Sequence, residues 1–172
     1  MRKIAIGLVL SVVPLLAGCG SSMTNYVKRE APWSLIKRVA VTPLTLPSEN
    51  PAQRELMTGI FAEELRNLGW MEVVEVPLED VLEPGALSVQ ELGRKHKVDA
   101  VFMGSLDDSQ GPAVHLRLLD AATEDLLWSG TFLLGTASDF LSLRTHQQRY
   151  KIAFRKLLAQ FASEAAVVPT AQ

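Results

Sequence analysis

Residues 98–106 read Val-Asp-Ala-Val-Phe-Met-Gly-Ser-Leu, and they are the most informative segment for the fold class. Its apolar run is almost uninterrupted, which is typical of a strand that is covered on both faces of a sheet. A strand of this kind needs neighbouring strands on both edges and packed elements above and below it. We therefore expect residues 98–106 to form a central strand.

The preceding sequence predicts two strand–helix units. Residues 37–44 are β-branched and apolar, with a proline near the end, and predict a first strand. Residues 51–69 open on a proline, carry apolar residues at three- and four-residue spacing, and close on a glycine, so they predict a helix. Residues 70–76 predict a second strand. Residues 88–97 predict a short helix that begins with a Ser-x-x-Glu capping box.

After the central strand the pattern changes to a hairpin and a final helix. Residues 113–119 and 125–134 predict two strands, joined by the turn-compatible residues 120–124. Residues 139–161 predict a long helix whose aromatic and aliphatic residues share one stripe. This helix also carries a basic outer side.

The resulting order is β-α-β-α-β-β-β-α, which predicts an α/β fold. The two crossovers require parallel pairing at the start and the hairpin requires antiparallel pairing at the end, so the sheet is mixed, with helices packed on it. The chain has 172 residues, 48% of them hydrophobic and 21% charged, which fits one packed domain. We place this single domain at 36–163, followed by a C-terminal tail at 164–172.

Charge and cysteine content exclude several functions. The formal net charge is -2, whereas nucleic-acid-binding proteins usually carry a strong basic excess, so we expect no nucleic-acid partner. The chain has one cysteine, which cannot form an internal disulfide or a Cys-rich zinc site.

The N-terminus has the layout of a secretory signal peptide, with a basic start and a short apolar stretch. Its end, Leu16-Ala17-Gly18-Cys19, resembles the bacterial lipobox. We expect residues 1–18 to be removed and Cys19 to be lipidated, with residues 19–35 as a flexible tether. The alternative is an ordinary signal peptide with a chance cysteine. No Asp follows Cys19, which favours an outer-membrane, periplasm-facing location.

Catalytic and metal-binding patterns are missing from the sequence. The three histidines, His96, His115 and His146, are far apart and lack metal-ligand spacing, and there is no Gly-rich phosphate loop. Asp107 and Asp108 are adjacent at a strand end, where paired carboxylates suit acid–base work, a hard cation or simply a solvated loop. We expect the loop, and so no enzymatic activity, no metal and no cofactor.

Acidic residues are segregated along the sequence. No Lys or Arg lies between Trp70 and Gly93, while basic residues concentrate at 28–38 and on the last helix. The segregation indicates either an ordinary solvated surface or an acidic side that attracts cationic ligands. The candidate ligand-facing residues are Glu72, Glu75, Glu79, Asp80, Glu83, Asp107 and Asp108.

Two tryptophans have alternative interpretations. Trp128 shares a strand face with other apolar residues, so we expect it in the core rather than on a stacking platform. Trp33 lies close to the expected anchor and could rest at the level of the lipid headgroups.

Residues 36–161 resemble a family of bacterial envelope lipoproteins that includes the TolB N-terminal domain, CsgG and LpoB. The resemblance rests on the strand Arg-Val-Ala-Val-Thr-Pro-Leu at 38–44, on the stretch 98–105 and on the hairpin 116–130. Members usually have Gly after the Thr of that hairpin, where this chain has Glu124. The departure affects the turn type and leaves the hairpin prediction intact.

Within this family the chain is similar in size and layout to the PelC-type lipoproteins of Pel exopolysaccharide export. The resemblance implies a ring-like homo-oligomer under the outer membrane that guides a cationic polysaccharide to an outer-membrane export porin. The alternative that it implies is an LpoB-like activator of a peptidoglycan synthase.

Overall fold

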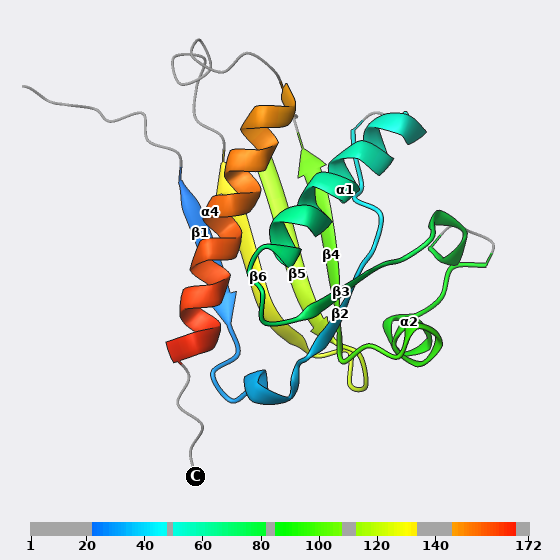
Figure 1. Ribbon diagram of the computed structural model, residues 1–172, viewed down its shortest axis with the longest axis vertical. Helices are drawn as coiled ribbons and strands as arrows, with labels where there is room; N and C mark the ends of the chain where they lie inside the picture. Colours follow the sequence, from blue (N-terminus) through cyan, green and yellow to red (C-terminus); the bar gives the residue numbers. More distant parts are fainter. Residues whose placement is uncertain (1–21, 48–49, 82–84, 108–112, 134–145, 168–172) are drawn as a thin grey trace, which may run out of the picture.

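The strand β4 (Ala100–Asp107) lies in the middle of a six-stranded sheet, as its apolar run predicts. We describe the fold from a computed structural model that covers residues 22–47, 50–81, 85–107, 113–133 and 146–167. The strand order over these residues is β1-β6-β5-β4-β2-β3 (Figure 1).

The sheet is mixed, and its pairing agrees with the sequence-based prediction. β2 pairs in parallel with both β3 and β4, because helical crossovers connect these strands. β4, β5 and β6 pair antiparallel, as a hairpin requires. The bounds of the other strands are β1 (Met23–Val27), β2 (Arg38–Val41), β3 (Glu72–Glu75), β5 (Ala113–Asp120) and β6 (Leu126–Leu133).

The helices of the described ranges cover the two faces of the sheet unequally. α1 (Pro51–Arg66) and α4 (His146–Val167) lie side by side across one face (Figure 1). α2 (Val89–His96) packs mainly against β2 and β4 on the opposite face, and its Gln90 side chain donates a hydrogen bond to the Ala122 carbonyl of the β5–β6 turn. Their starts follow the sequence signals: the Asn50 side chain caps α1, and Ser88 and Glu91 form the predicted capping box of α2.

The main core lies between the sheet and the α1–α4 pair and is rich in aromatic rings. Phe102 of β4 packs edge-on against Phe61 of α1 and Phe161 of α4, with ring centroids 5.6 and 5.5 Å apart. Trp128 is fully buried and lies 5.2 Å from the Phe161 ring, which confirms its expected place in the core. Such pairs add about 0.5–1.5 kcal/mol each beyond the area that they bury.

A smaller core lies under α2. Ala40 and Val101 point away from the aromatic cluster and pack against Leu92 of α2. β4 is therefore covered on both faces only over its first half, since Met103 and Ser105 of its second half are partly exposed on the α2 side.

The segment expected to be a flexible tether is in part a strand, which corrects the predicted organisation of residues 19–35. β1 pairs antiparallel with β6 along its whole length, although most of its side chains are exposed. Trp33 is 7% exposed and packs edge-on against Phe161, so it belongs to the core and not to a headgroup layer. Backbone pairing at a sheet edge needs no alternation of apolar residues, and the sequence pattern therefore missed β1.

The last helix also differs from its predicted bounds. It runs to Val167, so the start of the tail expected at 164–172 is helical. Glu164 accepts hydrogen bonds from Trp128 Nε1 at 2.9 Å and from Asn25, and these bonds connect α4 to β6 and β1. The expected helical residues 139–145 lie outside the described residues.

The β5–β6 hairpin turns through residues 120–125, as predicted. Asp120 Oδ1 accepts hydrogen bonds from the backbone N–H groups of Ala122 and Thr123, both at 2.8 Å. Glu124 has a φ of 62°, in the left-handed region that favours glycine. This is the position where the resembled family usually has glycine.

Candidate functional site

The acidic residues on β3 are paired with bases from elsewhere in the chain. Glu72 lies 3.1 Å from Arg38 Nε, and Glu75 lies 2.7 Å from an Arg66 guanidinium nitrogen. All four side chains are about one-third exposed or more, and such pairs contribute at most about 1 kcal/mol each. The two charges on β3 are therefore each balanced by a nearby base. Glu79 is exposed at the surface.

Asp80 differs from the expectation that it faces a ligand, because it is 4% exposed. Its carboxylate bonds to Lys95 and lies 2.8 Å from His96 Nε2. The hydrogen bond from Lys95, followed by the one from His96, lowers the pKa of the Asp80 carboxyl below its ordinary value. This cluster joins the short 3₁₀ turn Leu78–Asp80 to the end of α2.

The remaining candidates from the sequence do not come together with these residues in the described structure. Asp107 ends β4 and is half-buried, and β2 separates β4 from β3 in the sheet. Glu83, Asp108 and Cys19 lie outside the described residues.

Two basic residues of α4 are likewise paired, here with α1. Arg155 Nε lies 2.7 Å from Glu64 Oε2, and Lys151 Nζ lies 3.2 Å from Glu64 Oε1. Burial raises the pKa of the Glu64 carboxyl, but the hydrogen bonds and charges of Arg155 and Lys151 outweigh it, so the net pKa lies below the ordinary value.

One large surface of the sheet has no helix on it in the described structure. α2 covers only the β2–β4 end of its face, so alternate residues of β5, β6 and β1 stay at least partly exposed there. We call this surface the open face. The cross-strand register aligns on it Met103 with Arg117, Ser105 with His115, and then Ser129, Thr131, Thr24 and Tyr26.

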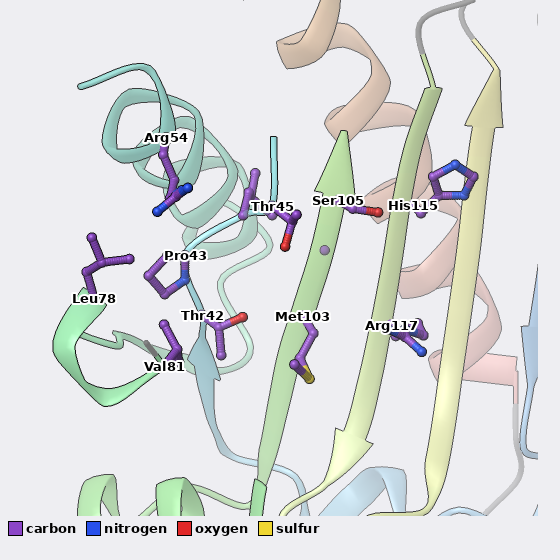
Figure 2. Close-up of a pocket in the computed structure, with 12 residues that line it drawn as sticks. Thr42, Pro43, Thr45, Arg54, Leu78, Val81, Met103, Ser105, His115 and Arg117 are labelled. Atoms are coloured by element: carbon purple, nitrogen blue, oxygen red, sulfur yellow. The ribbon is translucent and has the colours of Figure 1, made fainter. Parts of the chain in front are cut away.

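A pocket of about 280 Å³ is hollowed between the open face and the loop that follows β2. Its base is formed by Met103, Gly104 and Ser105 of β4, and one rim by Thr42 to Thr45. Arg54 of α1 stands on one side, and Arg117 and His115 of β5 on the other (Figure 2). Leu78 and Val81, on either side of Asp80, complete the wall.

The polar groups of this pocket are cationic or neutral. None of the described residues that line it is acidic. His115 Nδ1 lies 3.0 Å from Thr131 Oγ1, which leaves the Nε2 edge of the ring for another partner. Thr42 Oγ1 donates to the Phe102 carbonyl oxygen at 3.3 Å. The chemistry offered is that of binding an anion beside hydroxyl groups.

Sequence reasoning missed this pocket. The alternation Val114, His115, Leu116, Arg117 indicated that His115 and Arg117 share the less buried face of a strand. No local sequence pattern predicted that Arg54 lies near them. Its proximity follows from the strand order, in which β4 lies between β2 and β5.

The described residues hold no group of three or more His, Cys, Asp or Glu side chains that could bind a metal ion. Among the helices that the structure describes, none combines the length and apolar character needed to cross a bilayer.

No protein-family model and no curated protein matches the sequence. Among solved structures, the PelC dodecamer from Paraburkholderia phytofirmans is similar at a TM-score of 0.58 and 17% identity, over 85% of this chain and 97% of that chain. A variant PelC dodecamer from the same organism gives a TM-score of 0.54 and 18% identity, over 85% and 98%. Lipoprotein GNA1162 from Neisseria meningitidis gives 0.47 and 15%, over 74% and 99%. This chain thus has the mixed α/β fold of PelC.

Proposed function

We propose that this protein is a lipid-anchored accessory protein of exopolysaccharide export at the outer membrane, without enzymatic activity of its own. The observation that carries the proposal is the fold shared with PelC over nearly the whole length of both chains. The lipobox-like Leu16-Ala17-Gly18-Cys19 supports it independently, because it gives the chain the address of an envelope lipoprotein.

Cys19 is the proposed attachment point. Two or more acyl chains hold a protein on a bilayer stably, since each buried CH₂ contributes about 0.8 kcal/mol. The proposed location is the periplasmic face of the outer membrane, where an export porin is the expected neighbour.

Homo-oligomerisation is the second element of the proposal. PelC from P. phytofirmans is a dodecamer, and we propose a ring of identical subunits for this chain as well. A ring needs two different surfaces on each subunit that fit one another. The proposed role of the ring is to guide a cationic polysaccharide to the porin.

Fewer acidic residues are proposed to face the polymer than the sequence alone indicated. Glu72, Glu75 and Glu79 remain exposed and are proposed to face the polymer, together with Glu83, Asp107 and Asp108. A cationic polymer would have to compete with Arg38 and Arg66 for two of them. Buried Asp80 is left out of this set.

The experiment compares secretion in a strain that lacks the gene after complementation with the wild type or with Cys19→Ser. We expect the wild-type protein to fractionate with the outer membrane, to sediment as an oligomer in detergent and to restore polymer secretion. We expect Cys19→Ser to be soluble in the periplasm and to restore secretion poorly.

A monomer at high concentration, or normal secretion without the gene, would overturn the proposal. Direct capture of a peptidoglycan synthase together with cell-wall defects on deletion would instead support the LpoB-like role.

A further inference from the structure

We propose that the pocket beside β2 binds a carboxylated saccharide, through Arg54 and Arg117 on opposite sides of it. This inference rests on the pocket's own geometry and goes beyond the proposed export role, which concerns a cationic polymer and the acidic surface. Four features of the described residues support it.

First, the two guanidinium groups that line the pocket lack an acidic partner in the described part of the chain. Arg38, Arg66 and Arg155, by contrast, each lie 2.7–3.1 Å from a Glu carboxylate. Arg54 and Arg117 come from α1 and β5 and border the same hollow (Figure 2). Guanidinium groups are suited to bidentate recognition of carboxylates, so both are available to an anion from outside.

Second, hydroxyl groups lie between the two arginines, and an imidazole lies on the Arg117 side of the pocket (Figure 2). Ser105 and Thr45 line the pocket, and a β-bridge joins their backbones. His115 is fixed through Nδ1 by Thr131, so its Nε2 edge is oriented by a hydrogen bond and not by chance. These groups can donate to or accept from the hydroxyls of a sugar ring.

Third, the wall opposite the strands is apolar. Leu78, Val81 and Pro43 form this wall, and Met103 adds an apolar side chain at the base. A sugar ring presents C–H groups on its faces and hydroxyls on its rim, so it can pack on this wall while its rim meets Ser105 and Thr45. A bare inorganic anion would leave the apolar wall without a partner.

Fourth, the wall is held in place by a buried carboxylate with two basic partners. Asp80 lies between Leu78 and Val81 in the sequence and is fixed to Lys95 and His96 of α2. The volume of about 280 Å³ is close to the lower limit of ligand pockets, roughly 300–1,000 Å³. The site therefore fits one small sugar residue or the end of a chain.

Calorimetric titration of the purified full chain in detergent tests the proposal. The probes are glucuronate, glucose, glucosamine and inorganic phosphate. We expect saturable binding of glucuronate that weakens as salt is raised, weaker binding of phosphate, and no binding of glucose or glucosamine. Arg54→Gln and Arg117→Gln should each weaken glucuronate binding at least tenfold.

The matched control is Arg29→Gln, which removes the same charge from an exposed turn outside the pocket and should leave affinity unchanged within twofold. Circular dichroism verifies that each variant folds. Ser105→Ala should weaken glucuronate binding and leave phosphate binding unchanged.

Three results would overturn the proposal: no saturable glucuronate binding, binding that survives both arginine substitutions, or phosphate binding tighter than glucuronate. If the arginine substitutions change only the sedimentation of the protein, the pocket is a contact between subunits and the proposal fails. None of these outcomes bears on membrane anchoring or polymer secretion, so the proposed export role is tested separately.

Discussion

The indole Nε1 of Trp128 donates a hydrogen bond to Oε2 of Glu164 at 2.9 Å, which joins the buried centre of β6 to the last turns of α4. The same carboxylate accepts a bond from Gln160 Nε2 at 2.9 Å and one from Asn25 of β1. A single side chain thus connects three elements that are far apart in the sequence.

Replacing Glu164 by Ala should lower the free energy of unfolding by about 1–3 kcal/mol, because the buried Trp128 N–H loses its acceptor. Urea denaturation followed by tryptophan fluorescence measures the loss. The control is Ser163→Ala on the exposed side of the same turn, where we expect a change within about 0.5 kcal/mol. Equal stability of the two variants would contradict a structural role for this bond.

Glu64 should make stability depend on acidic pH. Its pKa in the folded protein is lower than its ordinary value of about 4.3, so it contributes stability above that pH and loses it as pH falls through the folded-state pKa. Glu64→Gln should therefore reduce the melting temperature at pH 7. In acid, the difference in melting temperature between the variant and the wild type should become smaller. Thermal melts from pH 7 to pH 3 measure this, and parallel curves would contradict it.

Asp80 is buried and its sequence neighbour Glu79 is exposed, so a variant of Glu79 is a matched control for a variant of Asp80. Asp80→Asn should lower the melting temperature at pH 7, because the buried carboxylate loses its charge beside Lys95 and His96. Since these partners lower the pKa of Asp80, the difference from wild type should shrink as pH falls below about 4. Glu79→Gln should leave the melting temperature unchanged. If Glu79→Gln is the more damaging of the two, the assignment is wrong.

Two glycines should respond to alanine in opposite directions. A Cβ at Gly130 of β6 would lie 2.5 Å from the Trp128 ring and 2.8 Å from Leu157, so Gly130→Ala should cost about 1–3 kcal/mol. A Cβ at Gly59 of α1 meets nothing within 4 Å, and Gly59→Ala should stabilise by about 0.5–1 kcal/mol through helix propensity. Chemical denaturation of both variants checks the sign of each change.

Glu124 occupies a left-handed position, which costs a non-glycine residue about 1–2 kcal/mol. Glu124→Gly relieves this cost but removes the acceptor of the Gln90 backbone N–H, 3.2 Å away. We expect the Gly variant to be at least as stable as wild type and the Ala variant to be less stable, because Ala loses the acceptor and keeps the cost. Urea midpoints of the three proteins test this order.

Local patterns predicted those elements whose faces are buried. The apolar run of β4 and the aromatic stripe of α4 reflect burial, the capping box at Ser88 reflects local hydrogen bonds, and each is confirmed. β1 was missed because it joins the sheet through backbone hydrogen bonds to β6, and such pairing does not require a pattern of apolar side chains.

The candidate site was harder to predict because ion pairs form between residues that can be far apart in the sequence. Glu75 and Arg66 are nine residues apart but Arg155 and Glu64 are 91 apart, so counting charges along the chain could not show which of them neutralise each other. Arg54 and Arg117 are notable because no acidic side chain among the described residues pairs with either of them.

The early start of β1 limits the length of the linker between the sheet and the proposed lipid attachment point at Cys19. Met23 is four residues beyond Cys19, and a fully extended chain spans at most about 3.6 Å per residue, or roughly 14 Å in all. If Cys19 is acylated, as proposed, the start of β1 lies no farther than this from the lipid attachment point, so the sheet edge is held close to the membrane surface.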